Sequence, residues 1–231
     1  MALHKKLDML QALGPSIAIV PECARPEIIK KNHPEFKFHD ADWVGVNKHK
    51  GLGVFSFLDY SFARHSLYTE KFHQYLPLII SDADGHIFNL LAVWSFNHRN
   101  ELKEPGHPTT LAFNHYRPFT LQKNSVVAGD FNNATIWDKP SGQNNMADTI
   151  ARLEEQNLIS AYHSFNSCLF GNESDSTHFW RKGELEFHID YCFIPVTSVL
   201  TNVEIGQRND WVKFSDHAPV IVDLEFKASA T

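Results

Sequence analysis

The chain is divided by short apolar runs, each of which is closed by Gly, Pro, Asn or Asp. These runs occupy residues 17–20, 53–57, 87–94, 126–128, 189–194 and 219–226. Short runs between turn-forming residues are typical of β-strands, because a helix needs a longer amphipathic stretch to bury one face. The first expectation is therefore a sheet-rich domain.

Two segments have helical spacing instead. Leucines recur every three or four residues over positions 3–13, and Gly14-Pro15 should end that helix. Residues 146–156 form a second amphipathic pattern, with Asn at position 144 or 145 as its N-cap and Asn157 as a left-handed terminator. The polar segment 97–123 is expected to be a long irregular excursion on the surface. No repeat or Gly/Ser linker divides the sequence, so one domain over residues 1–231 is expected.

Composition excludes several classes of protein. The net charge of -6 counts against a broad basic surface for long nucleic acid. No apolar run approaches the ~20 residues of a membrane span, and residues 1–14 lack the apolar core of a secretory signal, so a soluble, cytoplasmic protein is expected. The sequence leaves the oligomeric state open.

Cysteine and histidine patterns do not indicate a soft-metal site. Cys23, Cys168 and Cys192 are odd in number and form no CxxC pair, which argues against a disulfide framework or a thiolate zinc site. The fourteen histidines contain no HExxH pattern. A zinc hydrolase built from scattered histidines remains a minor alternative, and it predicts zinc retained through purification.

Polar side chains stand where the expected strands end. Asp130 and Asn132 follow the run 126–128 through Gly129, and a spacing of two in extended chain places both on one side. A carboxylate can orient a water while an amide donates to a phosphate oxygen. Taken alone, the same pair would also suit an ordinary Asx turn.

Three further segments also carry polar side chains at the ends of expected strands. Asp190 interrupts an apolar strand, where a carboxylate needs a cation, a metal or an imidazole unless it faces water at an edge. Asp216 and His217 lie side by side just before the last strand, and Glu22 follows the first. Glu beside a hard cation such as Mg²⁺ or Mn²⁺ is chemically apt, since these ions take oxygen ligands.

In this order, the strand-terminal Glu22 and the segments Gly-Asp-Phe-Asn at 129–132, Ile-Asp-Tyr-x-Phe at 189–193 and Ser-Asp-His-x-Pro-Val at 215–220 resemble the endonuclease/exonuclease/phosphatase superfamily. That superfamily includes deoxyribonuclease-like and apurinic-endonuclease-like enzymes. The resemblance spans residues 17–224, and the segment 51–54 is similar to the family's next strand entry. It implies an α/β fold, a four-layer sandwich of two mixed β-sheets flanked by helices.

The resemblance also implies roles for the site residues. Glu22 and Asp216 would be ligands of Mg²⁺ or Mn²⁺, and Asp130 would orient or deprotonate the attacking water. Asn132 would hold the phosphate, and Asp190 would pair with His217 so that the imidazole stabilises charge on the phosphoryl oxygens. A further contact is expected after the strand 90–94, from Asn97 or, as second choice, from His98.

The superfamily's first strand normally carries a Trp-Asn-x-Asn-like segment, whereas this sequence begins with the helical pattern. The resemblance therefore implies that the N-terminal strand is missing from the chain as written. A sheet edge would be exposed without it. We expect a version extended upstream to be more stable and more active.

The function expected from these residues is metal-assisted hydrolysis of a phosphodiester, most naturally by a nuclease. The alternatives are a phosphatase of inositol- or sphingolipid-type phosphoesters and a catalytically degenerate binding or structural protein. The partner is then nucleic acid or a small phosphoester. Trp94, Trp137 and Trp180 could stack on bases, although core packing is the commoner use of Trp.

Overall fold

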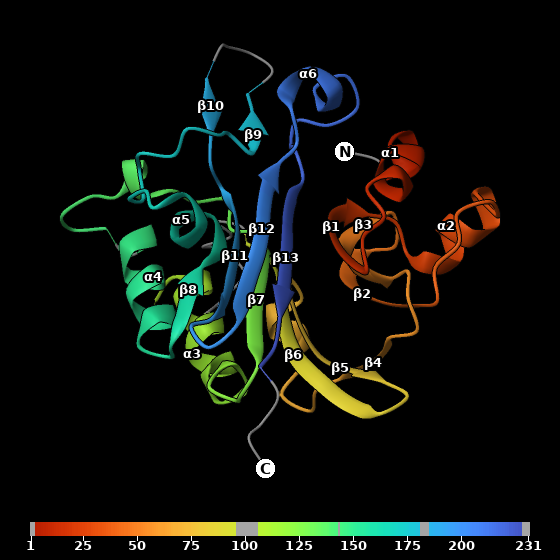
Figure 1. Ribbon diagram of the computed structural model, residues 1–231, viewed down its shortest axis with the longest axis horizontal. Coiled ribbons are helices and arrows are strands. Elements are labelled where there is room, and N and C mark those ends of the chain that lie inside the picture. The colour runs from red at the N-terminus through yellow and green to blue at the C-terminus, as the bar shows by residue number, and fades with distance from the viewer. Residues whose placement is uncertain (1–2, 96–105, 143, 181–184, 228–231) are drawn as a thin grey trace.

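A computed structural model describes residues 3–95, 106–142, 144–180 and 185–227, and Figure 1 shows its arrangement. Its largest sheet has six strands in the order β4-β5-β6-β7-β11-β8. The strands are β4 (Ser61–Arg64), β5 (Tyr75–Asp82), β6 (Gly85–Trp94), β7 (Ser125–Asp130), β11 (Asp190–Pro195) and β8 (Leu158–Ser160). β6 and β7 are parallel and the other neighbours are antiparallel, so the sheet is mixed.

The remaining strands form smaller antiparallel sheets. A three-stranded sheet has the order β1-β3-β2, and separate two-stranded sheets pair β12 with β13 and β9 with β10. Their bounds are β1 (Ile17–Cys23), β2 (Asp40–Asn47), β3 (Lys50–Ser56), β9 (His178–Phe179), β10 (Glu186–Phe187), β12 (Val199–Ile205) and β13 (Val220–Glu225).

Helices flank these sheets, and α6 (Arg208–Trp211) lies beyond the ends of β12 and β13 (Figure 1). α1 (Leu7–Ala12) and α2 (Pro26–Asn32) lie beside the three-stranded sheet. α3 (Pro108–Thr120), α4 (Met146–Glu154) and α5 (Ala161–Asn166) lie beside the six-stranded sheet, and α6 precedes β13. Short 3-10 turns occur at Leu3–Lys5, Glu70–Phe72 and Thr135–Trp137.

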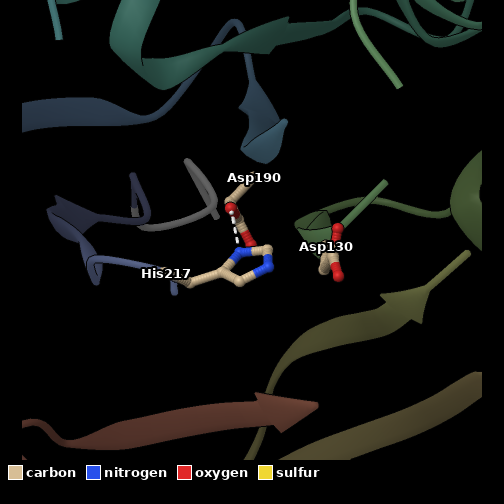
Figure 2. Close-up of side chains that lie close together, drawn as sticks. All are labelled: Asp130, Asp190 and His217. Atoms are coloured by element: carbon tan, nitrogen blue, oxygen red, sulfur yellow. Dashed lines mark hydrogen bonds and ion pairs between the residues drawn. The ribbon is translucent and has the colours of Figure 1, made fainter. Parts of the chain in front are cut away.

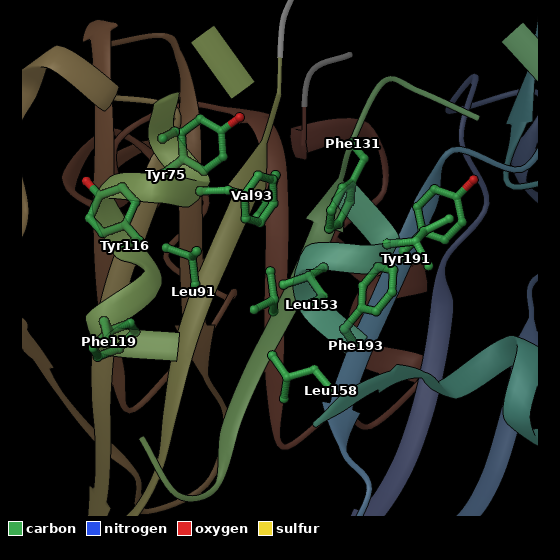
Figure 3. Close-up of a cluster of buried hydrophobic side chains, with 14 of the residues drawn as sticks. Tyr75, Leu91, Val93, Tyr116, Phe119, Phe131, Leu153, Leu158, Tyr191 and Phe193 are labelled. Carbon is green, nitrogen blue, oxygen red and sulfur yellow. The ribbon is translucent and has the colours of Figure 1, made fainter. Parts of the chain in front are cut away.

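The described residues form four apolar cores, of which the fourth packs α5 and α6 against β11, β12 and β13. Side chains of α3 and α4, including Tyr116 and Leu153, pack on the outer face of the six-stranded sheet against Leu91 (Figure 3). A second core lies between the six-stranded and three-stranded sheets, and a third lies between the three-stranded sheet and the segments of α1 and α2. The four-layer α/β sandwich expected from the sequence is thus confirmed, although among the described strands only the six-stranded sheet is mixed.

The expectation of an irregular surface segment over 97–123 was wrong, because α3 occupies half of it. His107 caps the helix by accepting a hydrogen bond from the Thr109 backbone N–H, and Pro108 stands in its first turn. Helical spacing then places Ala112, Tyr116 and Phe119 in the core, which the polar composition of the segment had obscured.

Other sequence expectations agree with the structure in most details. The strands expected at 17–20, 53–57, 87–94, 126–128, 189–194 and 219–226 correspond to β1, β3, β6, β7, β11 and β13. α4 lies where the second helix was expected and Asn157 is left-handed, with φ 59°, but the cap comes from elsewhere. Asp138 accepts hydrogen bonds from the N–H groups of Met146 and Ala147. All three cysteines are free, and no helix of the described residues is long and apolar enough to cross a membrane.

Candidate active site

Two carboxylates meet where β7 ends and β11 begins. The antiparallel register pairs Asp130 directly with Asp190, so both leave neighbouring strands at the same level of the sheet. Gly129 makes this possible, because its φ is +138° and a Cβ there would lie 2.0 Å from the Val93 carbonyl oxygen on β6. Only glycine permits such a close approach of β7 to β6 next to Asp130.

The third member of the group is His217. Its Nδ1 donates a hydrogen bond to Asp190 Oδ2 at 2.8 Å, and Asp130 lies beside the same ring (Figure 2). One ligand atom from each of Asp130, Asp190 and His217 can be chosen so that all lie within 4.8 Å of one another. The predicted pairing of Asp190 with His217 is present in the structure.

Neighbouring charges within this group alter the pKa values of Asp130 and His217. Burial and the negative charge of Asp190 raise the pKa of Asp130 well above its usual range, although the charge of His217 acts in the opposite direction. Burial disfavours the His217 imidazolium, yet Asp190 and the other carboxylates outweigh it and raise the pKa of His217 to about 9. At neutral pH the imidazole is therefore charged, and Asp130 retains a proton more readily than an exposed aspartate.

Asn132 holds Asp130 in place. Its backbone N–H donates to Asp130 Oδ1 and its side-chain Nδ2 donates to Oδ2, each at 2.8 Å. Nδ2 also donates to the Ser95 carbonyl at 2.9 Å, which ties the pair to the end of β6. Asn132 adopts a left-handed φ of 47°, a conformation that Asn tolerates better than most residues. Its predicted contact with phosphate stays a prediction.

Glu22 lies in a strained bulge of β1. Its φ is 59°, and the register of β1 against β3 shifts between Val20 and Cys23. Its Oε1 accepts from Lys50 Nζ at 2.9 Å. Burial would raise the pKa of Glu22, but the hydrogen bond and the positive charge of Lys50 help to hold it below its ordinary value. The Glu22 carboxylate is therefore ionised and paired with the Lys50 ammonium.

The predicted metal ligands Glu22 and Asp216 are not in the compact group of Asp130, Asp190 and His217. Both nevertheless act electrostatically on it, since Glu22 raises the pKa of Asp130 and Asp216 raises that of His217. The donors around the site are mostly carboxylate oxygens, which suits a hard divalent ion better than zinc. The ligand assignment itself stays a prediction.

Thr177, which was not among the expected site residues, ties the strands of the site together. Thr177 is fully buried, and its Oγ1 accepts from the backbone N–H groups of Ile189 and Asp190 at 3.0 and 3.1 Å. Its carbonyl accepts from Ala218 N–H at 2.8 Å, while Phe179 N–H donates to the Asp216 carbonyl at 2.7 Å. This segment therefore fixes both sides of the Asp190–His217 pair, and no local sequence signal marks it.

A row of aromatic rings leads away from His217. The centroid of the His178 ring lies 4.7 Å from that of His217, and the Phe187 ring is stacked with His178 at a centroid distance of 6.3 Å. Trp137 contacts Phe187 edge-on at 4.8 Å and is 41% exposed. Trp180, 49% exposed, lies 6.3 Å from His178. Trp94 is buried in the core, so Trp137 and Trp180 alone of the three candidates can reach a ligand.

Asn97 and its alternative His98 lie outside the described residues, so their predicted contact is untested.

Neither protein-family models nor curated proteins give a match to this chain. Solved structures do. An AP endonuclease from Archaeoglobus fulgidus is 13% identical with a TM-score of 0.68, and the alignment covers 98% of this chain and 96% of that one. A 3′ phosphatase from Neisseria, bound to a product DNA hairpin, is 16% identical with a TM-score of 0.65 and coverages of 97% and 96%. A mannosyl-6-phosphatase from Bacteroides thetaiotaomicron is 17% identical with a TM-score of 0.56 and coverages of 95% and 89%.

Proposed function

We propose, on the premise that this chain has the endonuclease/exonuclease/phosphatase fold, that it is a divalent-metal-dependent phosphoesterase. The observation that carries the proposal is the group of Asp130, Asp190 and His217. Three segments far apart in the sequence deliver two carboxylates and an imidazole fixed by one of them to one place. Groups with displaced pKa values gathered together mark functional sites.

In this proposal Asp130 accepts a proton from the attacking water. Its raised pKa suits that task, because a general base works best when its pKa lies near the working pH. Asn132 holds both oxygens of the carboxylate, so the orientation of Asp130 is set before substrate binds.

His217 stabilises the charge that develops on the phosphoryl oxygens. Asp190 holds the ring through Nδ1, which leaves Nε2 as the donor toward the substrate. Glu22 and Asp216 would hold Mg²⁺ or Mn²⁺, in keeping with the oxygen-rich donor set. When bound, such an ion polarises the phosphate and stabilises the leaving oxygen.

The substrate we propose is a phosphodiester of a nucleotide or a short nucleic acid, which makes the protein a nuclease. The ring contacts that link His217 to Trp137 through His178 and Phe187 support this choice, because exposed aromatic rings suit stacking with bases. The net charge of -6 favours a short or single-stranded ligand over broad contact with a duplex. Similar folds act on other esters, as the name of the Bacteroides mannosyl-6-phosphatase states.

The test is a substrate panel with Mg²⁺: single-stranded and duplex DNA, RNA, a chromogenic phosphodiester, and inositol, sugar and sphingolipid phosphates. Asp130→Asn and His217→Ala are compared with Asp84→Asn and His39→Ala, two exposed positions away from the site. We expect each site variant to lose at least about 100-fold in kcat/KM, and each control to stay within twofold. Activity that survives both site variants would reject the site.

Trp137→Ala tests the substrate class. We expect it to weaken cleavage of oligonucleotides about 10-fold while leaving the chromogenic diester unchanged, because a stacked base contributes about 1–3 kcal/mol. An equal effect on both substrates would contradict the nuclease assignment. A folded wild-type protein that neither hydrolyses any substrate nor binds Mg²⁺ or Mn²⁺ would instead support a degenerate binding or structural role.

A further inference from the structure

Lys6 brings an ammonium group to the site from the start of the chain. Its Nζ donates to Ser215 Oγ at 3.2 Å, and the same Oγ accepts from the His217 backbone N–H at 3.1 Å. Ser215 is almost completely buried, at 1% exposure. A single hydroxyl therefore connects Lys6 to the backbone of the imidazole residue.

The position of Lys6 is set by packing. Leu3 and Leu7, on either side of it, are 3% and 4% exposed in the core between the three-stranded sheet and α1. Lys6 occupies the N-cap position of α1 between these anchors, and its carbonyl accepts from Leu10 N–H at 2.9 Å. By contrast, the neighbouring Lys5 is exposed. Of the two adjacent lysines, Lys6 is therefore the one that is held in a partly buried position.

The Lys6 ammonium lies in the field of the site's carboxylates. Burial lowers the pKa of Lys6, while the charges of Asp216, Asp190 and Glu22 act in the opposite direction. An ammonium has three N–H donors, and the hydrogen bond to Ser215 uses one of them. Lysine binds phosphate as a point charge, and a partly buried ammonium gains most from an anionic ligand because water screens it little.

We propose that Lys6 binds the phosphoryl group of the substrate, donating to a nonbridging oxygen from the side of the site where Ser215 holds it. This rests on the proposed phosphoesterase function. A phosphate ester approaching Asp130, Asp190 and Asp216 meets negative charge, and Lys6 supplies positive charge at that point alongside His217 and the divalent ion. The alternative role is a resting counter-cation that competes with the metal for the carboxylates.

The experiment compares Lys6→Gln and Lys6→Arg with Lys5→Gln, which removes the same charge from an exposed neighbour. Calorimetry with Mg²⁺ alone and then with inorganic phosphate in saturating Mg²⁺ is followed by kcat and KM on the preferred substrate. We expect Lys6→Gln to weaken phosphate binding about 10- to 100-fold and to lower kcat/KM at least as much, the size of a lost charge-assisted hydrogen bond. Lys6→Arg should recover part of both, and Mg²⁺ affinity should stay the same or tighten.

Three results would overturn the proposal. One is phosphate affinity in Lys6→Gln equal to that in Lys5→Gln, whatever the melting temperature does. Another is higher activity with tighter Mg²⁺ binding, which identifies Lys6 as the competing counter-cation. The third is failure of wild-type protein to bind phosphate at all. If the wild type hydrolyses nothing, the phosphoesterase function fails, while the calorimetric comparison of phosphate affinity still decides the role of Lys6.

Discussion

Replacing Asp190 by Asn tests the electrostatic reading of the site most directly. Asp190 is the largest favourable influence on the charged His217 ring, to which it is bonded at 2.8 Å, and Asn keeps the shape of the side chain without its charge. Raising the pKa of His217 from 6.5 to about 9 corresponds to about 3 kcal/mol in favour of the imidazolium. Without Asp190, burial opposes the charged ring against only the weaker influence of Asp130 and Asp216, so the pKa of His217 should fall.

The same shift sets the sign of a stability difference. The pKa of His217 is higher in the folded state than in the unfolded state, so its charged form stabilises the fold fully below about pH 6.5. That contribution disappears as pH rises through about 9. Wild type should therefore exceed Asp190→Asn by about 2–3 kcal/mol in free energy of unfolding at pH 6, and the difference should vanish near pH 10.

The assays are imidazole NMR titration in EDTA, with His217→Ala to assign the signal, and urea unfolding at several pH values. Asp84→Asn, in the exposed β5–β6 turn, controls for loss of a negative charge. A His217 pKa that moves by less than half a unit in Asp190→Asn, or a stability difference independent of pH, would refute this reading.

Other changes probe the scaffold. Gly129→Ala should lose more than about 2 kcal/mol of stability and most activity, measured by urea unfolding and hydrolysis, because the new Cβ meets the Val93 carbonyl; a melting temperature equal to wild type would be inconsistent with this. Glu173 accepts from His163 Nε2 at 3.0 Å, and its pKa is lowered to about 2 despite opposing burial. Its stabilisation is present above about pH 4.5 and lost as pH falls toward 2, so Glu173→Gln should cost about 2 kcal/mol at pH 7 and nothing near pH 2 in the same unfolding assay. Phe193→Ala should cost about 3–5 kcal/mol by leaving a cavity in a fully buried position, and denaturation midpoints that match wild type would exclude that.

Most of the strands of the main layers and the helix α4 could be predicted from the local pattern of apolar residues. Apolar runs closed by turn residues located six strands, and helical spacing located α4, because burial of one face imposes a period that sequence displays directly. The helix α3 was not predicted from the sequence, because its apolar positions at 112, 116 and 119 stand among polar residues and its N-cap is a histidine. Edge strands such as β4, with mostly exposed side chains, carry too little pattern to be seen.

For the site, the sequence by itself determined which residue types stand at the ends of strands: Asp130 at the end of β7 with Asn132 just beyond it, Asp190 at the start of β11, and His217 before β13. Only the tertiary structure decided how they meet. The register of β7 against β11, the buried hydroxyl of Thr177 and the packing that carries Lys6 to Ser215 are long-range contacts. Such contacts arise from whole layers fitting together, and no local spacing encodes them.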